Sequence, residues 1–210
     1  MGVRRRKPVV VGVADHGGWA ILVSAAAVNG QPVVIDRRRV PIIDEGVPSQ
    51  PYHHDTLTLA DDEAEALLRT VKRSVAACTA RALDHLPIDL GPQYHVAAIT
   101  IREPPLDRLP ATAKEAHASY FVQCRADGML YHSAICHAAD RRGWTVVRVA
   151  RGDELARAAK ALRCRERDVE RFVAGLKATL GAPWSAEHRN AFAAAMAELS
   201  VRTKLRLGAG

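Results

Sequence analysis

Three acidic residues lie where the hydrophobic pattern predicts the ends of structural elements. Asp15 closes the first apolar run of the chain, and Glu103 follows a second apolar run at residues 95–101. Glu187 opens a helical pattern near the carboxyl terminus, and Asn190 lies three residues later on the same helical face. Carboxylates that converge from two strand ends and a helix form an oxygen-rich site for one or two Mg²⁺ ions. Two such ions can activate water and stabilise the leaving oxygen in phosphodiester hydrolysis.

Each of these acids also has a purely structural explanation. An Asp before His-Gly-Gly commonly forms a turn, and Glu103, which precedes two prolines, is consistent with a solvated loop acid. Glu187 in the first turn of a helix is favoured by the helix dipole alone. The prediction of a site therefore rests on the order of the three acids within one topology.

The first forty residues predict a three-stranded antiparallel meander. Residues 8–14 form a short run rich in β-branched valine, as in a buried strand. Residues 19–24 and 32–40 are expected to form the next two strands. Asn29-Gly30, between the second and third strands, is a strong signal for a two-residue hairpin turn.

The remainder of the chain predicts helices that alternate with two further strands. Apolar residues recur at helical spacing over residues 61–86 and 113–142, and Gly128 in the second helix would allow close approach of a neighbour. The further strands are expected at residues 95–101 and 144–149. Three shorter helices follow, at residues 152–162, 166–180 and 186–199.

This order predicts an α/β fold with one mixed five-stranded sheet, in which three antiparallel strands are followed by parallel strands and helices flank both faces. In such sheets ligands collect beyond the carboxyl ends of adjacent strands, where Asp15 and Glu103 are expected. We assign residues 8–200 to this single domain, residues 1–7 to a basic amino-terminal tail and residues 201–210 to a flexible tail.

Composition limits the class of protein. The chain has 210 residues, of which 48% are hydrophobic and 25% charged, so it can form a folded domain and is not a disordered polymer. No apolar run approaches the ~18–20 residues needed to cross a bilayer. The four cysteines form no CxxC pair, which favours free thiols and a cytoplasmic protein over a disulfide or zinc framework.

The charge balance favours a polyanionic partner, nucleic acid before membrane. Thirty Lys and Arg outweigh 23 Asp and Glu, and much of the excess lies in residues 4–7 and 37–39. Aromatic residues make up only 5% of the chain, so a platform for stacking single-stranded bases is poorly supplied. Recognition of duplex or junction shape is the better expectation.

The succession of an Asp after strand one, a Glu after strand four and an acid in the last helix resembles the ribonuclease H-like superfamily. The second half is similar to the RuvC-type Holliday-junction resolvases. The similarity lies in the strand at residues 143–149, the basic helix at 165–173 and the closing helix at 187–195.

The resemblance implies a Mg²⁺- or Mn²⁺-dependent endonuclease that acts on branched DNA as a homodimer. It places Asp15 and Glu103 on metal-binding carboxylates and Glu187 on a further metal ligand of the catalytic set. Asn190 occupies the position where the family normally has a final Asp. Asn190 would be an auxiliary catalytic ligand without charge, which weakens the hold on a second metal.

The resemblance also implies a basic face that grips DNA phosphates, with the candidate contacts Arg102, Lys114, Arg125, Arg151, Lys160 and Arg163. Because of Asn190, a relative that binds nucleic acid without cleaving it stays an alternative. A protein-interaction module, in which the basic surface confers only solubility, is the third.

Overall fold

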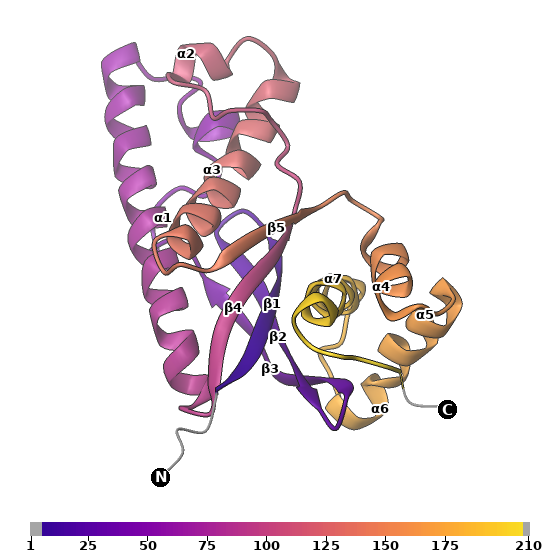
Figure 1. Cartoon of the computed structure of the whole chain (residues 1–210). Helices are drawn as coiled ribbons and strands as arrows, with labels where there is room; N and C mark the ends of the chain where they lie inside the picture. Colours follow the sequence, from indigo (N-terminus) through magenta and orange to yellow (C-terminus); the bar gives the residue numbers. More distant parts are fainter. Residues whose placement is uncertain (1–5, 208–210) are drawn as a thin grey trace.

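Five strands form one mixed sheet in the order β3-β2-β1-β4-β5 (Figure 1). This computed structural model describes residues 6–207. The first residues of the predicted amino-terminal tail, Arg4 and Arg5 included, lie outside that range. β2 is antiparallel to both β1 and β3, whereas β1, β4 and β5 run parallel, as predicted. The strands are β1 (Lys7–Asp15), β2 (Trp19–Val28), β3 (Gln31–Pro41), β4 (Tyr94–Arg102) and β5 (Thr145–Val149).

The hairpin between β2 and β3 has the predicted turn. Asn29 and Gly30 both adopt positive φ, 52° and 76°, the left-handed conformation that a type I′ turn requires of its two central residues. The right-handed twist of such a turn matches that of the strands, so the hairpin fixes the register of β2 against β3.

All predicted helical stretches form helices, but two of them are broken, and the short helix at Pro51–Asp55 was not predicted. Ser119 interrupts the stretch expected at 113–142, because its hydroxyl caps a new helix by accepting a hydrogen bond from the Val122 N–H at 3.2 Å. The stretch at 166–180 also divides, at Leu176. The elements are η1 (Pro51–Asp55), α1 (Asp61–Leu90), α2 (Ala113–Ala116), α3 (Tyr120–Asp140), α4 (Glu154–Leu162), α5 (Glu166–Gly175), α6 (Lys177–Leu180) and α7 (Ala186–Arg202).

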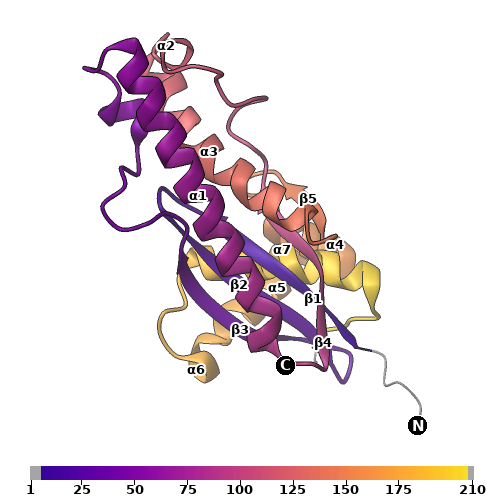
Figure 2. The ribbon, with the colours of Figure 1, turned by 90° about the vertical axis from the view of Figure 1, so that its left-hand side faces the viewer.

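The helices form two layers, one on each face of the sheet. α1 and α3 cover one face and α7 covers the other, with α4 and α5 outside α7 (Figures 1 and 2). Alternate residues of β1 serve the two layers: Val9, Val11 and Val13 lie in the core with α1 and α3, whereas Val10 and Ala14 lie in the core with α7.

Gly12 allows α7 to approach the sheet closely. A Cβ atom on Gly12 would lie 1.9 Å from the carbonyl oxygen of Ala191, so no larger residue fits without displacement of the helix. Gly128, which the sequence suggested for close approach, is not at such a contact, because its nearest neighbour would be Pro105 Cγ at 3.5 Å. The close contact is therefore between strand and helix on the other face of the sheet.

The end of the described chain lies against the β2–β3 hairpin. The Arg206 N–H donates to the Gly30 carbonyl at 2.9 Å, and Leu205 and Leu207 pack against the α7-side core. All four cysteines are free, as expected from their spacing. Within residues 6–207 no helix is long and apolar enough to cross a membrane.

Candidate functional site

The carboxyl ends of β1, β4 and β5 meet at one edge of the sheet. β1 and β4 are parallel with Gly12 opposite Thr100, and continuation of that register brings Asp15 level with Glu103. The Glu103 N–H donates to the Val149 carbonyl at 3.0 Å, which ties the end of β4 to that of β5. The two acids predicted at strand ends therefore lie at the same edge.

Strand alternation directs Asp15 away from α7. Asp15 is in phase with Val11 and Val13, whose side chains contact the α1/α3 layer. Its Oδ2 lies 4.0 Å from Nδ1 of His132, a buried residue of α3. Burial lowers the pKa of His132, and the nearby Asp15 carboxylate opposes that shift. Asp15 thus associates with the layer opposite the one that carries Glu187.

His16, not Asp15, reaches Glu187. Its Nε2 lies 3.0 Å from Glu187 Oε1, and its ring stacks on Trp19 with centroids 3.8 Å apart and 10° between the ring planes. Sequence reasoning missed His16, although its position one residue after Asp15 places it on the opposite face of the strand.

Arg102 at the end of β4 pairs with Glu154 of α4. The Arg102 Nε–Glu154 Oε1 distance is 3.3 Å, and the buried Glu154 also accepts a hydrogen bond from the Gly152 N–H at 2.9 Å. Arg102, predicted to contact DNA, therefore neutralises an internal acid. Glu154 was not singled out from the sequence. Its position in the first turn of α4 is favoured by the helix dipole.

A cleft of ≈ 10 Å³, room for about one water molecule, separates this pair from Glu187 and Asn190. Thr100 also lines the cleft, and among the described residues its buried hydroxyl has no hydrogen-bond partner. Glu187 and Asn190 lie together on α7, as predicted from their spacing, but Asp15 and Glu103 do not line the cleft.

This arrangement does not fit a divalent metal centre as it stands. Within residues 6–207 no group of three His, Cys, Asp or Glu side chains is placed to hold a metal ion. Glu187 contacts His16, Asp15 faces His132, and Asn190 carries no charge. The metal-binding roles of Asp15, Glu103 and Glu187 therefore stay predictions.

The basic run at residues 37–39 stabilises the fold. Arg37 donates to the carbonyls of Leu180, Gly181 and Pro183, which holds the segment before α7 against β3. Arg38 pairs with Asp36 at 2.7 Å and with Asp89 of α1. The Arg39 guanidinium lies 4.3 Å from the centre of the Trp19 ring. The basic run at residues 37–39, which in the sequence suggested a polyanionic partner, thus makes contacts within the protein.

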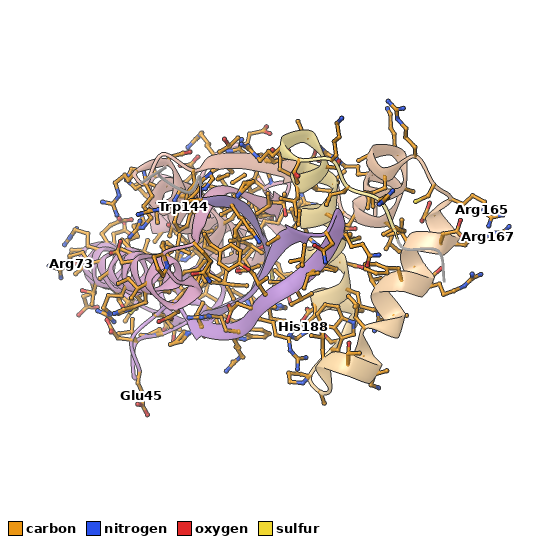
Figure 3. The ribbon with its side chains drawn as sticks, turned by 60° about the horizontal axis from the view of Figure 1, so that its bottom comes forward. Glu45, Arg73, Trp144, Arg165, Arg167 and His188 are labelled. Carbon is orange, nitrogen blue, oxygen red and sulfur yellow. The ribbon has the colours of Figure 1, made fainter. Side chains whose placement is uncertain are left out.

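The carboxyl-terminal third carries the remaining excess of positive charge. Residues 141–210 contain fifteen Lys and Arg and seven Asp and Glu, whereas residues 8–140 contain eleven and sixteen. Figure 3 shows Arg165 and Arg167 at the outer edge of α5, at the opposite end of the molecule from Arg73 of α1. The two layers therefore differ in charge as well as in position.

The predicted phosphate contacts divide between these layers. Arg151, Lys160 and Arg163 are exposed around α4, whereas Lys114 lies on α2. Arg125 lies on α3, where its guanidinium covers the Phe121 ring at 3.8 Å and donates to the Pro105 carbonyl at 3.2 Å. The structure brings together only the α4 group.

A groove of ≈ 590 Å³ runs between β5, α4 and α7. Arg157, Lys160 and Arg163 line it, and Glu198 is its only acidic lining residue. Arg157 donates to the Arg148 carbonyl at 2.9 Å. Lys160 and Arg163 make no side-chain hydrogen bond or ion pair with the rest of the described chain, so both charges are available to a ligand.

No family model and no curated protein sequence matches the chain. Among solved structures, it is similar to the Thermus thermophilus RuvC structure, with 15% identity over 92% of this chain and 95% of that chain and a TM-score of 0.48. It is also similar to T. thermophilus RuvC in complex with a Holliday junction substrate, with 16% identity, 92% and 94% coverage and a TM-score of 0.49. The α/β fold predicted from the sequence, a mixed five-stranded sheet flanked by helices, is confirmed by the strand order and directions of this sheet.

Proposed function

We propose that this chain binds nucleic acid through the layer formed by α4, α5 and α7. The observation that carries the proposal is the segregation of charge, which gives residues 141–210 fifteen basic and seven acidic residues and residues 8–140 eleven basic and sixteen acidic residues. A basic face attracts the phosphate backbone, whose neutralisation releases counterions and supplies most non-specific affinity. Duplex or branched DNA is the expected ligand.

The availability of individual cations supports this choice of face. Arg37, Arg38 and Arg39 are held by carbonyl, carboxylate or aromatic groups of the fold. Lys160 and Arg163 are exposed and line a groove. A phosphate can therefore approach the second group without breaking an internal contact.

Mg²⁺- or Mn²⁺-dependent cleavage of DNA is the second candidate, favoured by the β1–β4 register that brings Asp15 and Glu103 to one sheet edge. Asp15, Glu103 and Glu187 would hold the ion, and Asn190 would add a neutral oxygen. In the structure His16 already contacts Glu187, so the acids would have to rearrange. The homodimer is likewise a proposal, which light scattering of the full chain tests directly.

The test is fluorescence anisotropy with a labelled four-way DNA junction, a duplex and an RNA/DNA hybrid, each at several salt concentrations. Lys160→Glu/Arg163→Glu should weaken junction binding at least about tenfold, because two phosphate contacts become repulsive. The matched control is Arg69→Glu/Arg73→Glu on exposed positions of α1, with the same change in charge. Equal losses in both variants, or binding that does not depend on salt, would contradict the proposal and favour a protein-interaction role.

Cleavage is measured on the same junction with Mg²⁺ or Mn²⁺ present. The wild-type chain is compared with Asp15→Asn and with Asn190→Asp. Products that disappear in Asp15→Asn would establish the second candidate. Binding without products in the wild type and in Asn190→Asp would establish a binding domain that does not cleave DNA.

A further inference from the structure

One stripe of α7 borders three hollows that follow one another along the helix. Glu187, Asn190 and Ala191 line the small cleft at the carboxyl ends of β1 and β4. Ala194 lines both that cleft and the groove beside α4, and Ala197, Glu198 and Val201 line the groove further along. The next residue, Arg202, lines a third hollow. These positions recur at intervals of three or four residues and therefore lie on one side of the helix.

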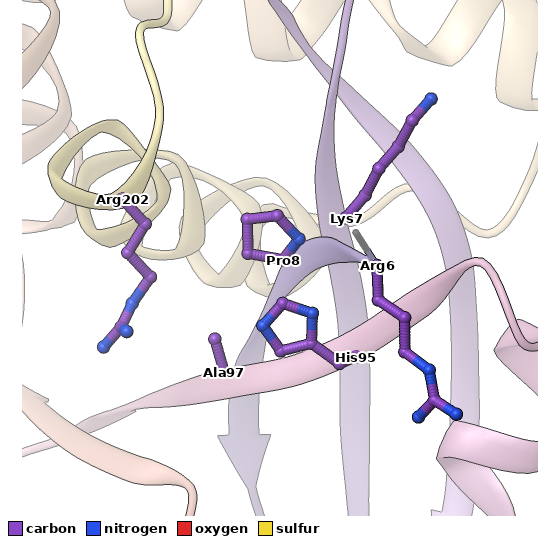
Figure 4. Close-up of a pocket in the computed structure, with 6 residues that line it drawn as sticks. All are labelled: Arg6, Lys7, Pro8, His95, Ala97 and Arg202. Carbon is purple, nitrogen blue, oxygen red and sulfur yellow. The ribbon is translucent and has the colours of Figure 1, made fainter. Parts of the chain in front are cut away.

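The third hollow is a basic pocket at the opposite end of the sheet from the candidate site. It has a volume of ≈ 410 Å³ and is lined by Arg6, Lys7, Pro8, His95, Ala97 and Arg202. Figure 4 shows that these residues come from three elements: the start of β1, the start of β4 and the end of α7. No acidic residue lines this pocket among the part of the chain that is described.

The three basic side chains of the pocket and His95 are exposed, and most of them have no internal partner. Arg6, Lys7 and His95 make no side-chain hydrogen bond or ion pair with other described residues. Arg202 pairs with Glu198 at 2.8 Å. The groove and the pocket together thus present six cations, Arg6, Lys7, Arg157, Lys160, Arg163 and Arg202, and one acid.

The strand register gives the offset between groove and pocket. Val147 in the groove is paired with Thr100, and His95 in the pocket lies five residues earlier on β4. Five residues of strand span about 17 Å. One DNA strand advances about 3.4 Å per base pair along the helix axis, so the offset equals roughly five base-pair steps.

On the basis of the proposed function, we infer that the α7 groove and the basic pocket form one track for a nucleic-acid backbone. The track leads from the candidate site at the carboxyl ends of β1 and β4 to the amino end of the sheet. Arg6 and Lys7, with His95 and the Glu198-paired Arg202 beside them, form its distal phosphate-binding subsite.

A phosphate backbone fits this surface better than an acidic protein does. Three cations border the groove and three border the pocket at the end of α7, and the groove is lined by the small side chains of Ala194 and Ala197, so a thin, regularly charged polymer can contact the two sets in turn. Pro8 and Ala97 add a short apolar floor next to His95, against which a sugar can pack.

The experiment measures the anisotropy of a labelled duplex of about 20 base pairs, long enough to cover both hollows. The full chain is compared with Arg6→Glu/Lys7→Glu, Lys160→Glu/Arg163→Glu and the α1 control Arg69→Glu/Arg73→Glu. The Arg6/Lys7 variant should bind several-fold more weakly than the control, and its slope of log K against log salt should be shallower by about 1.8, or 0.9 per lost phosphate contact. Thermal melts of each variant establish that the fold is retained.

The outcomes separate the track from the proposed function. If the wild type binds DNA and only the Lys160/Arg163 variant is impaired, the groove binds DNA and the distal subsite is wrong. If the wild type does not bind DNA at all, the proposed function itself fails. A parallel titration with poly-L-glutamate covers the other partner class: binding of that polymer that depends on Arg6 and Lys7, with DNA binding unchanged, would assign the pocket to an acidic protein and overturn the track.

Discussion

The two faces of the sheet use the same strand in different ways. Toward α1 and α3, β1 presents Val9, Val11 and Val13, and the facing core includes the large side chains Tyr131 and Leu68. Toward α7, β1 presents Val10, Gly12 and Ala14 against a helix that has alanine at positions 191, 193–195 and 197. Large residues keep one layer at ordinary packing distance, whereas small residues bring the other layer into backbone contact.

The difference extends to charge. α1 has six acidic and four basic residues, so its surface carries a net negative charge. The α7 layer has a basic groove along the closely packed helix. The face on which β1 meets a helix through small residues is thus also the face to which we assign binding.

The largest expected effect is on this difference in packing. Gly12→Ala places a methyl group 1.9 Å from the Ala191 carbonyl oxygen. Because that oxygen belongs to the backbone of α7, the clash is relieved only if the helix moves, and we expect the unfolding free energy to fall by about 3 kcal/mol or more. Gly128→Ala on the other face meets only Pro105 Cγ at 3.5 Å and should be neutral or stabilise α3 by up to about 1 kcal/mol. Urea unfolding of both variants measures the difference. Equal unfolding free energies for the two variants would show that α7 does not approach β1 as closely as the structure indicates.

The next effect concerns the buried ion pair of the α7 layer. Arg102→Met leaves the buried Glu154 carboxylate without its cation and should cost about 3 kcal/mol. The double variant Arg102→Met/Glu154→Leu removes both charges and should recover most of that loss. A double-mutant cycle from chemical denaturation measures the coupling, and additive losses would mean that the two residues do not interact.

A smaller, pH-dependent effect is expected on the α1/α3 layer. Burial raises the pKa of Asp127 in α3 to about 7, although its carboxylate accepts hydrogen bonds from the Tyr52 and His53 N–H groups, which oppose the shift. The charge of Asp55 acts in the same direction as burial.

Because the folded pKa is raised, the folded state binds the proton more tightly than the unfolded state does. The resulting stability is present below the ordinary pKa of Asp and is lost as the pH rises through about 7. The unfolding free energy of the wild type should therefore fall by roughly 2 kcal/mol more than that of Asp127→Asn between pH 5 and pH 8. Parallel slopes for the two proteins over that interval would contradict the assignment.

The smallest effect separates cations that stabilise the fold from cations that bind. Arg39→Gln removes the contact with the Trp19 ring and should lower the unfolding free energy by about 0.5–1 kcal/mol. Its affinity for DNA should stay within about twofold of the wild type, since one cation outside the groove contributes little. A loss of affinity comparable to that of the Lys160/Arg163 variant would place the 37–39 run in the binding surface.

Local signals were sufficient for most of the elements. Asn29-Gly30 predicted the hairpin, the β-branched run predicted β1, and the helical spacing of apolar residues predicted α1. The break between α2 and α3 was missed, because the apolar spacing continues through it and only the cap formed by Ser119 ends the pattern.

The candidate site was harder to predict from the sequence. The order of Asp15, Glu103 and Glu187 predicted that they would gather at one end of the sheet, but strand alternation turns Asp15 toward His132 and His16 toward Glu187. Glu154 could not be paired with Arg102 from sequence, since 52 residues separate them. A one-residue difference in phase decides which layer a strand residue contacts, and that phase follows from the packed helices.

The sequence by itself determined the five strands, the flanking helices and the excess of positive charge, because these follow from periodicity, turn chemistry and composition. Only the tertiary structure decided which cations are available. The 37–39 run appears in the sequence as a binding patch, yet it is held by carbonyl, carboxylate and aromatic groups from distant segments. Arg6 and Arg202, at opposite ends of the chain, share one pocket because β1 and α7 pack in contact at Gly12. Such proximity depends on backbone approach across the core, and local sequence carries no information about it.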